Sequence, residues 1–179
     1  ALLFRKQPDF NVLGFFPTDL HAKKHNHQAK METDQKKQDE FFMRKALAEA
    51  EIAFGENEIP VGAVVVCKGQ IISRAHNLTE TLTDVTAHAE MQAITSAANA
   101  LGGKYLTDCT LYITVEPCPM CAGAIGWAQI PRIVYGASDE KRGYHIFAPN
   151  VMHPKSTVTS GVLEEECRNL MQEFFKKRR

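Results

Sequence analysis

Two cysteines three positions apart, Cys118 and Cys121, could hold a metal ion together. Residues at this spacing lie on one face of a helical turn, so both sulfur atoms can reach a single point. Pro117 keeps the preceding residue extended, and Pro119 suits the first turn of a helix. The positive end of that helix favours the thiolate, which is the form that binds a metal. The sequence therefore predicts a metal-binding pair where a strand gives way to a helix.

His88 and Glu90 provide the other groups that such a site needs. A Cys-x-x-Cys pair alone is also typical of a redox pair or of half a structural zinc site. Structural zinc takes four protein ligands, whereas catalytic zinc keeps three and leaves one position for water. His88 and the two cysteines make three. Glu90, at the first turn of the same helix as His88, is better placed to handle the protons of a zinc-bound water than to bind the metal.

Length and composition fit one compact domain with an additional tail. The 179 residues carry 21 basic and 21 acidic side chains, and 44% of them are hydrophobic. This balance does not indicate a polyanionic partner, although a local basic patch would escape such totals. The odd number of cysteines, five, disfavours a disulfide framework and indicates a reducing cytoplasm. No apolar run is long enough to span a bilayer, so no membrane partner is expected.

The beginning of the chain differs from the rest. Short apolar runs without a regular period precede a polar basic cluster at 21–27, and the first coherent helical pattern begins at Met31. We therefore expect residues 1–30 to be a disordered or non-native extension, and residues 31–179 to form the domain that carries the metal site.

Apolar residues at helical spacing predict helices at 39–55, 88–101, 122–129 and 161–179. Runs rich in β-branched residues predict strands at 61–66, 70–75, 110–115, 132–136 and, more weakly, 156–159. Lys68-Gly69 predicts a hairpin between the first two strands, and the continuous apolar run of the first indicates burial on both faces. The strand–helix–strand order around Cys118 implies a parallel crossover. The expected fold is α/β, a three-layer α/β/α sandwich with a mixed five-stranded sheet.

The spacing of His88-Ala89-Glu90 and Pro117-Cys118-Pro119-Met120-Cys121 matches the signature of zinc nucleobase deaminases. On these motifs the chain resembles the cytidine deaminase superfamily. Within it, four further segments resemble the bacterial tRNA-specific adenosine deaminases: 59–66, 86–90, 135–139 and 174–179. The resemblance runs from about Asp39 to the C-terminus and implies that residues 31–179 are a zinc-dependent deaminase domain with a cytidine deaminase-like fold.

This resemblance implies hydrolytic conversion of adenosine to inosine at the wobble position of a tRNA anticodon. The expected partners are a tRNA anticodon stem-loop and a second copy of the chain in a homodimer, with one Zn²⁺ per subunit. His88, Cys118 and Cys121 would hold the zinc, and zinc-bound hydroxide would attack the base. Glu90 would be the catalytic proton shuttle to a ring nitrogen and then to the leaving amine, which is worth roughly 10²–10⁴-fold.

The resemblance also implies substrate contacts at Asn77, Asp139 and the backbone of Ala89. Asn77 would hydrogen-bond the flipped base, although Asn at a strand end is also typical of a turn. Asp139 would contact the ribose or loop backbone, and the alternative is a solvated loop carboxylate. His76 stands where family members often have an aromatic residue. Trp127 is expected in the core or at a dimer interface.

Two other functions stay open. The Pro-Cys-Pro-Met-Cys motif and the following 123–128 also resemble guanine deaminase, so a free nucleobase deaminase acting on guanine or cytosine is the alternative enzyme. From another class, a non-enzymatic, zinc-stabilised interaction module would use the same ligands with Glu90 solvated nearby. The basic ending could contact phosphates or simply complement the dipole of its helix.

Overall fold

The structure, a computed structural model, describes residues 18–178, with side chains from residue 28 onward. The chain divides into two compact units between Gln35 and Lys36, and each is described by itself. The described part of the first unit is helical and belongs to α1 (Thr18–Gly55), which includes residues 18–30 of the expected extension. Residues 1–17 of that extension lie outside the described residues. The division of the chain at residue 30 stays a prediction.

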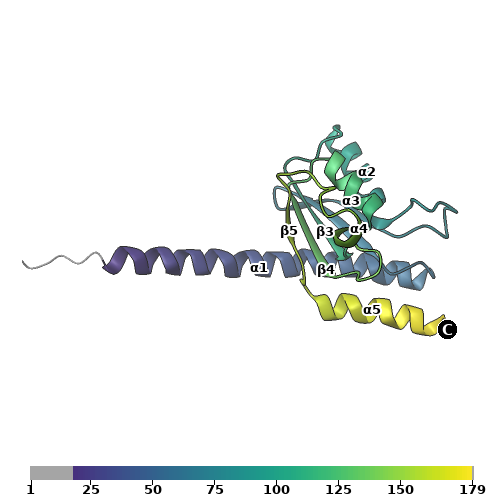
Figure 1. Cartoon of the computed structure of the whole chain (residues 1–179), viewed down its shortest axis with the longest axis horizontal. Helices are drawn as coiled ribbons and strands as arrows, with labels where there is room; N and C mark the ends of the chain where they lie inside the picture. Colours follow the sequence, from purple (N-terminus) through teal and green to yellow (C-terminus); the bar gives the residue numbers. More distant parts are fainter. Residues whose placement is uncertain (1–17, 179) are drawn as a thin grey trace, which may run out of the picture. The chain divides into compact units, whose positions relative to one another are not determined.

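Within the described residues, five strands form one sheet in the order β2-β1-β3-β4-β5 (Figure 1). They are β1 (Gly62–Cys67), β2 (Gln70–His76), β3 (Cys109–Val115), β4 (Arg132–Ala137) and β5 (Thr157–Thr159). β1 pairs antiparallel with β2 and β3, whereas β4 pairs parallel with β3 and β5. The predicted mixed five-stranded sheet is confirmed.

The turn between β1 and β2 is the predicted hairpin. Lys68 and Gly69 have φ values of 50° and 78°. A two-residue type I′ turn requires positive φ at both central positions, because only then does its twist match that of the flanking strands.

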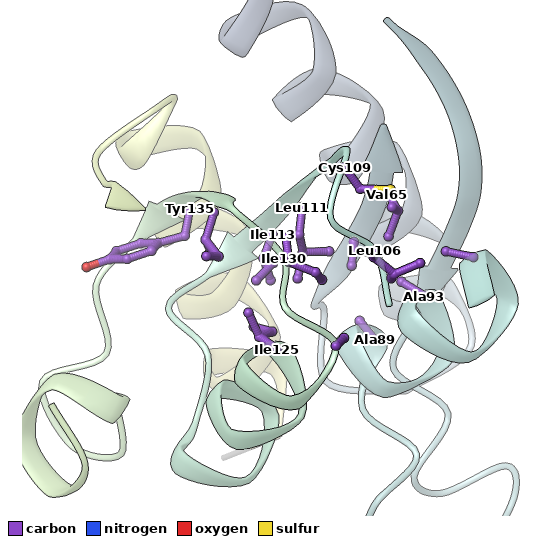
Figure 2. Packing of buried hydrophobic residues seen from close by; sticks show 14 residues of the cluster. Val65, Ala89, Ala93, Leu106, Cys109, Leu111, Ile113, Ile125, Ile130 and Tyr135 are labelled. Atoms are coloured by element: carbon purple, nitrogen blue, oxygen red, sulfur yellow. The ribbon is translucent and has the colours of Figure 1, made fainter. Parts of the chain in front are cut away.

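Helices cover both faces of the sheet (Figure 1). On one face, α2 (Ala89–Leu101) and α3 (Pro119–Trp127) pack on residues such as Val65, Leu111 and Ile113, as Figure 2 shows. On the other, α1 and α5 (Glu164–Lys177) pack on Val64 and Val66. Alternate residues of β1 are therefore buried on opposite faces, and the predicted three-layer arrangement is confirmed.

The predicted elements differ from the observed ones in detail. A short helix, α4 (Tyr144–Phe147), lies in the segment that we expected to be a loop. α5 begins at Glu164 rather than near 161, because Gly161 and Leu163 have φ values of 81° and 53°, in the left-handed region. Trp127 is 84% exposed, so the core position considered for it is wrong.

A partly buried ion pair connects the second-unit part of α1 to the sheet. Arg132 on β4 donates to both carboxylate oxygens of Asp39, at 2.8 and 2.7 Å, and the Tyr112 hydroxyl donates to the same carboxylate at 3.0 Å. Gly62 allows a close approach of helix and strand, since a Cβ there would lie 2.5 Å from the backbone nitrogen of Ala50. Across the described residues, none of the helices combines the length and apolar character needed to cross a membrane.

Candidate active site

The residues with metal-binding side chains lie at the first turns of α2 and α3. His88 is the residue that precedes α2, and Cys118 the residue that precedes α3; both have extended backbones, with φ and ψ of −68° and 155° and of −71° and 167°. Pro119 occupies the beginning of α3, where its missing N–H leaves no hydrogen bond unmade. Cys121 follows one turn later and is buried. Both helices therefore direct their positive ends toward one place.

The three side chains converge there. Nδ1 of His88 lies 3.5 Å from Sγ of Cys121 and 3.8 Å from Sγ of Cys118. All three ligand atoms lie within 4.8 Å of one another. Among the described residues, no other three histidine, cysteine or acidic side chains bring their ligand atoms this close together. The cluster could hold a metal ion.

The three groups also shift one another's pKa values. Hydrogen bonds from the Cys121 thiol and from His88 lower the pKa of the Cys118 thiol to about 4, against the opposing effect of burial. The same bond to Cys118 raises the pKa of Cys121 and that of His88. Cys118 is thus the thiolate of the group. A metal ion would displace protons from the other two, because thiolate and neutral imidazole are the binding forms.

Glu90 lies beside this cluster. Its side chain is 3% exposed, and its carboxyl group shares a hydrogen bond with the Cys121 thiol. Burial raises the pKa of Glu90, because a charged carboxylate is poorly solvated there. The structure thus brings His88, Glu90, Cys118 and Cys121 together, as the sequence predicted. Their geometry puts a carboxyl group within hydrogen-bond reach of one of the three groups that could hold a metal.

The predicted substrate contacts come from three different segments: the end of β2, the first turn of α2 and the loop after β4. Asn77 directly follows β2 and is 4% exposed, and the next residue, Leu78, donates its N–H to the Ala87 carbonyl, adjacent to His88, at 3.0 Å. Ala89 is the first residue of α2 and is fully buried. Asp139 is half-buried in the loop after β4, where its Oδ1 accepts the backbone N–H groups of Lys141 and Arg142 at 2.9 and 3.0 Å. Its carboxylate therefore organises its own loop, and contact with a ribose stays a prediction.

Two buried glutamates that we did not single out hold the neighbouring loops. Glu58 is fully buried and Glu116 is 4% exposed. Glu116 accepts the backbone N–H of Asp139 at 3.1 Å and that of His145 at 3.2 Å, and it contacts Nδ1 of His145 at 2.5 Å. The only sequence signal is a charged residue flanking an apolar strand and close to a proline: Glu58 before Pro60, and Glu116 before Pro117.

Other polar residues singled out in the sequence make intramolecular contacts. His76 lies between Glu49 and Glu56, at 3.4 and 3.2 Å from their carboxylates. At the basic ending, the Lys177 ammonium lies 4.5 Å from the Phe54 ring centre, and Arg178 donates to the carbonyl of Asn57 at 2.5 Å. These two cations hold the end of α5 against the end of α1.

Comparisons with known proteins identify the family of this chain. The model of the MafB19-like deaminase family matches residues 37–179. The chain is 46% identical over 147 residues to a tRNA-specific adenosine deaminase of Bacillus subtilis, a match that covers 79% of this chain and 91% of that protein. It is also 44% identical to a solved structure from a study of A-to-I editing by tRNA:A34 deaminases, with a TM-score of 0.69 over 73% of this chain and 98% of that one.

A guanine deaminase structure from Bacillus subtilis is also similar, at 44% identity and a TM-score of 0.53. That match covers 55% of this chain and 64% of the guanine deaminase chain, which is less than the tRNA deaminases give. By the extent of these matches, the chain belongs to the family of tRNA-specific adenosine deaminases, with the cytidine deaminase-like fold.

Proposed function

We propose that this chain is a zinc-dependent hydrolase that converts adenosine to inosine at the wobble position of a tRNA anticodon. The observation that carries the proposal is the convergence of His88, Cys118 and Cys121 beside the buried carboxyl group of Glu90. The names of the similar tRNA deaminases support tRNA as the substrate.

The ligand distances support zinc. A tetrahedral ion with Zn–S of about 2.3 Å and Zn–N of about 2.0–2.1 Å separates its nitrogen and sulfur ligands by about 3.5 Å. Nδ1 of His88 is 3.5 Å from one sulfur and 3.8 Å from the other. With three protein ligands, one Zn²⁺ per subunit would keep a position open. When bound, zinc supplies Lewis-acid activation of water near neutral pH.

The chain's own residues would move the protons. Glu90 would accept a proton from the attacking water and deliver it to a ring nitrogen of the base, then to the departing amino group. Its burial limits exchange of that proton with solvent, and its raised pKa favours the transient protonated form that the relay needs. Asn77, Asp139 and the backbone N–H of Ala89 would hold the nucleoside.

We also propose a homodimer in the cytoplasm. Trp127 at the end of α3 is 84% exposed, and so large an apolar side chain on the surface favours burial against a second copy. All five cysteines are free, which fits a reducing compartment. Light scattering of the protein and of a Trp127→Ser variant tests the dimer, which the variant should weaken.

The substrate is tested by direct comparison. The zinc-loaded protein is incubated with an anticodon stem-loop that carries adenosine at the wobble position, and nucleosides are measured by mass spectrometry. A matched stem-loop with the adenosine one position away is the control. Ammonia release from guanine and cytosine is measured in parallel, because the similar guanine deaminase makes that activity the second candidate. We expect inosine from the first stem-loop only. Ammonia from a free base without inosine would contradict the tRNA assignment.

A further inference from the structure

Glu58 is the most deeply buried carboxylate near the site that has no part in the proposed chemistry. It is fully buried in the segment between α1 and β1. It accepts hydrogen bonds from the backbone N–H groups of Thr81 at 2.7 Å and Glu80 at 3.2 Å. The hydroxyl of Thr79 lies 3.4 Å from the Glu58 carboxylate, and Nδ2 of Asn77 donates to the same carboxylate at 2.9 Å. One carboxylate thus holds both Asn77 and the loop that leads toward α2.

These donors keep Glu58 ionised. Burial alone would raise the pKa of this carboxyl, but the hydrogen bonds from Thr81, Glu80 and Thr79 outweigh it and lower the pKa. A buried charge persists only where such donors replace its water. Glu58 is therefore an acceptor toward every group that faces it.

An acceptor at this position decides which way the Asn77 carboxamide points. Nδ2 donates to Glu58 Oε2 and to Thr79 Oγ1, both at 2.9 Å, so both of its hydrogens are used. No residue in the described range donates a hydrogen bond to Oδ1 of Asn77, and this oxygen is not among the buried unpaired atoms. A flipped carboxamide would place this oxygen against the carboxylate of Glu58, which is repulsive.

We propose that Glu58 is a positioning residue for substrate binding: it holds the amino group of Asn77 inward, so that Oδ1 meets a hydrogen-bond donor of the target nucleoside. This rests on the proposed role of Asn77 as a substrate contact. The backbone beside Asn77 lies next to the metal-binding cluster, because Leu78 donates its N–H to the carbonyl of Ala87, the residue before His88, at 3.0 Å. Loss of Glu58 would free the carboxamide to rotate and release the loop at residues 79–81.

A reciprocal exchange of donor and acceptor tests this. In Glu58→Gln, an amide NH2 group replaces one of the two carboxylate oxygens. Whichever oxygen it replaces, the NH2 group faces a hydrogen-bond donor, either Nδ2 of Asn77 or the N–H of Thr81. In Asn77→Asp, two carboxylates lie side by side. The double variant relieves the clash between positions 58 and 77, because the new amide at position 58 donates to the new carboxylate at position 77 and the remaining oxygen of the amide still accepts from Thr81. The second oxygen of that carboxylate still faces the substrate. The N–H of Glu80 then faces the new amide at 3.2 Å, so the recovery is partial.

We expect each single variant to lower kcat/KM by roughly 10- to 100-fold, mainly through KM, since the contact holds ground state and transition state alike. The exchanged pair should recover to within about tenfold of the unaltered protein. Bound zinc should stay at one equivalent in all variants, because neither residue touches the ligands. The matched control combines Glu116→Gln with Asn77→Asp. Glu116 is a similarly buried carboxylate that holds the other loop, so this combination should show no recovery.

The same variants are unfolded in urea, a readout that needs no turnover. The exchanged pair should have a higher midpoint than either single variant. Activity is followed on whichever base the unaltered protein deaminates, so a lack of inosine would contradict the tRNA assignment and leave this test in place. Purely additive losses in both the activity and the urea series, or full activity in Glu58→Gln, would overturn the positioning role.

Discussion

Replacing Glu90 by glutamine separates catalysis from metal binding. Glutamine keeps the volume of the side chain and can still bond to the Cys121 thiol, but it cannot carry a proton. Glu90 is buried at 3% exposure and shares its hydrogen bond with a ligand rather than taking a ligand position itself. The variant should therefore keep its zinc and its fold and lose turnover.

The size of the loss follows from the proton transfers that Glu90 would perform. General acid–base help is worth about 10²–10⁴-fold, which corresponds to about 2.7–5.4 kcal/mol in the activation barrier at about 1.36 kcal/mol per tenfold. The free energy of unfolding should change by less than about 1 kcal/mol, because burial already disfavours the charged carboxylate and the neutral amide avoids that cost.

The loss of turnover is measured as the single-turnover rate of inosine formation in the stem-loop. The zinc content of the same variant is measured by mass spectrometry. Glu165→Gln on the exposed side of α5 is the matched control and should behave as the unaltered protein. A Glu90→Gln protein that holds one zinc and turns over within about threefold of the unaltered enzyme would refute the proton shuttle. Loss of zinc from the variant would instead mean that Glu90 is a ligand.

Three further outcomes are expected. Asp39→Asn leaves half-buried Arg132 without its charge partner and should lower the free energy of unfolding in urea by about 2–3 kcal/mol, whereas Glu164→Gln, which breaks an exposed pair with Arg168, should cost less than about 0.5 kcal/mol. Because hydrogen bonds to Glu58 lower its pKa below 4.5, its stabilising contribution is present above pH 4.5 and is lost as the pH falls through the folded-state pKa; Glu58→Gln should flatten the acid side of a stability–pH profile measured in urea. Cys121→Ser should reduce bound zinc, while Cys167→Ser, in the core on the other face of the sheet, should keep one equivalent by mass spectrometry; equal zinc in both would argue against the assigned ligands.

Local sequence signals predicted most of the fold. The positive φ of Lys68 and Gly69, and the two-sided burial of Val64 and Val65, follow from short-range turn chemistry and apolar patterning. The convergence of His88 with the two cysteines was also predictable, because this set of residues at this spacing is typical of ligands that share a metal ion.

Contacts between distant segments could not be read in this way. Asp39 pairs with Arg132 across 93 positions, and Glu58 accepts backbone N–H groups 22 and 23 positions away. Almost every residue type has a backbone N–H group, so no sequence pattern shows which of these groups will bond to a buried carboxylate. The left-handed φ of Leu163, 53°, lies where α5 begins and is unfavourable for a leucine, so local preference does not predict it.

The glutamates beneath the two loops accept main-chain N–H groups of Glu80, Thr81 and Asp139, and Glu58 also accepts from the side chain of Thr81. A main-chain bond of this kind does not depend on the side chain that the loop position carries. A substitution at Glu80 would therefore leave its main-chain bond to Glu58, and with it the path of this loop, in place.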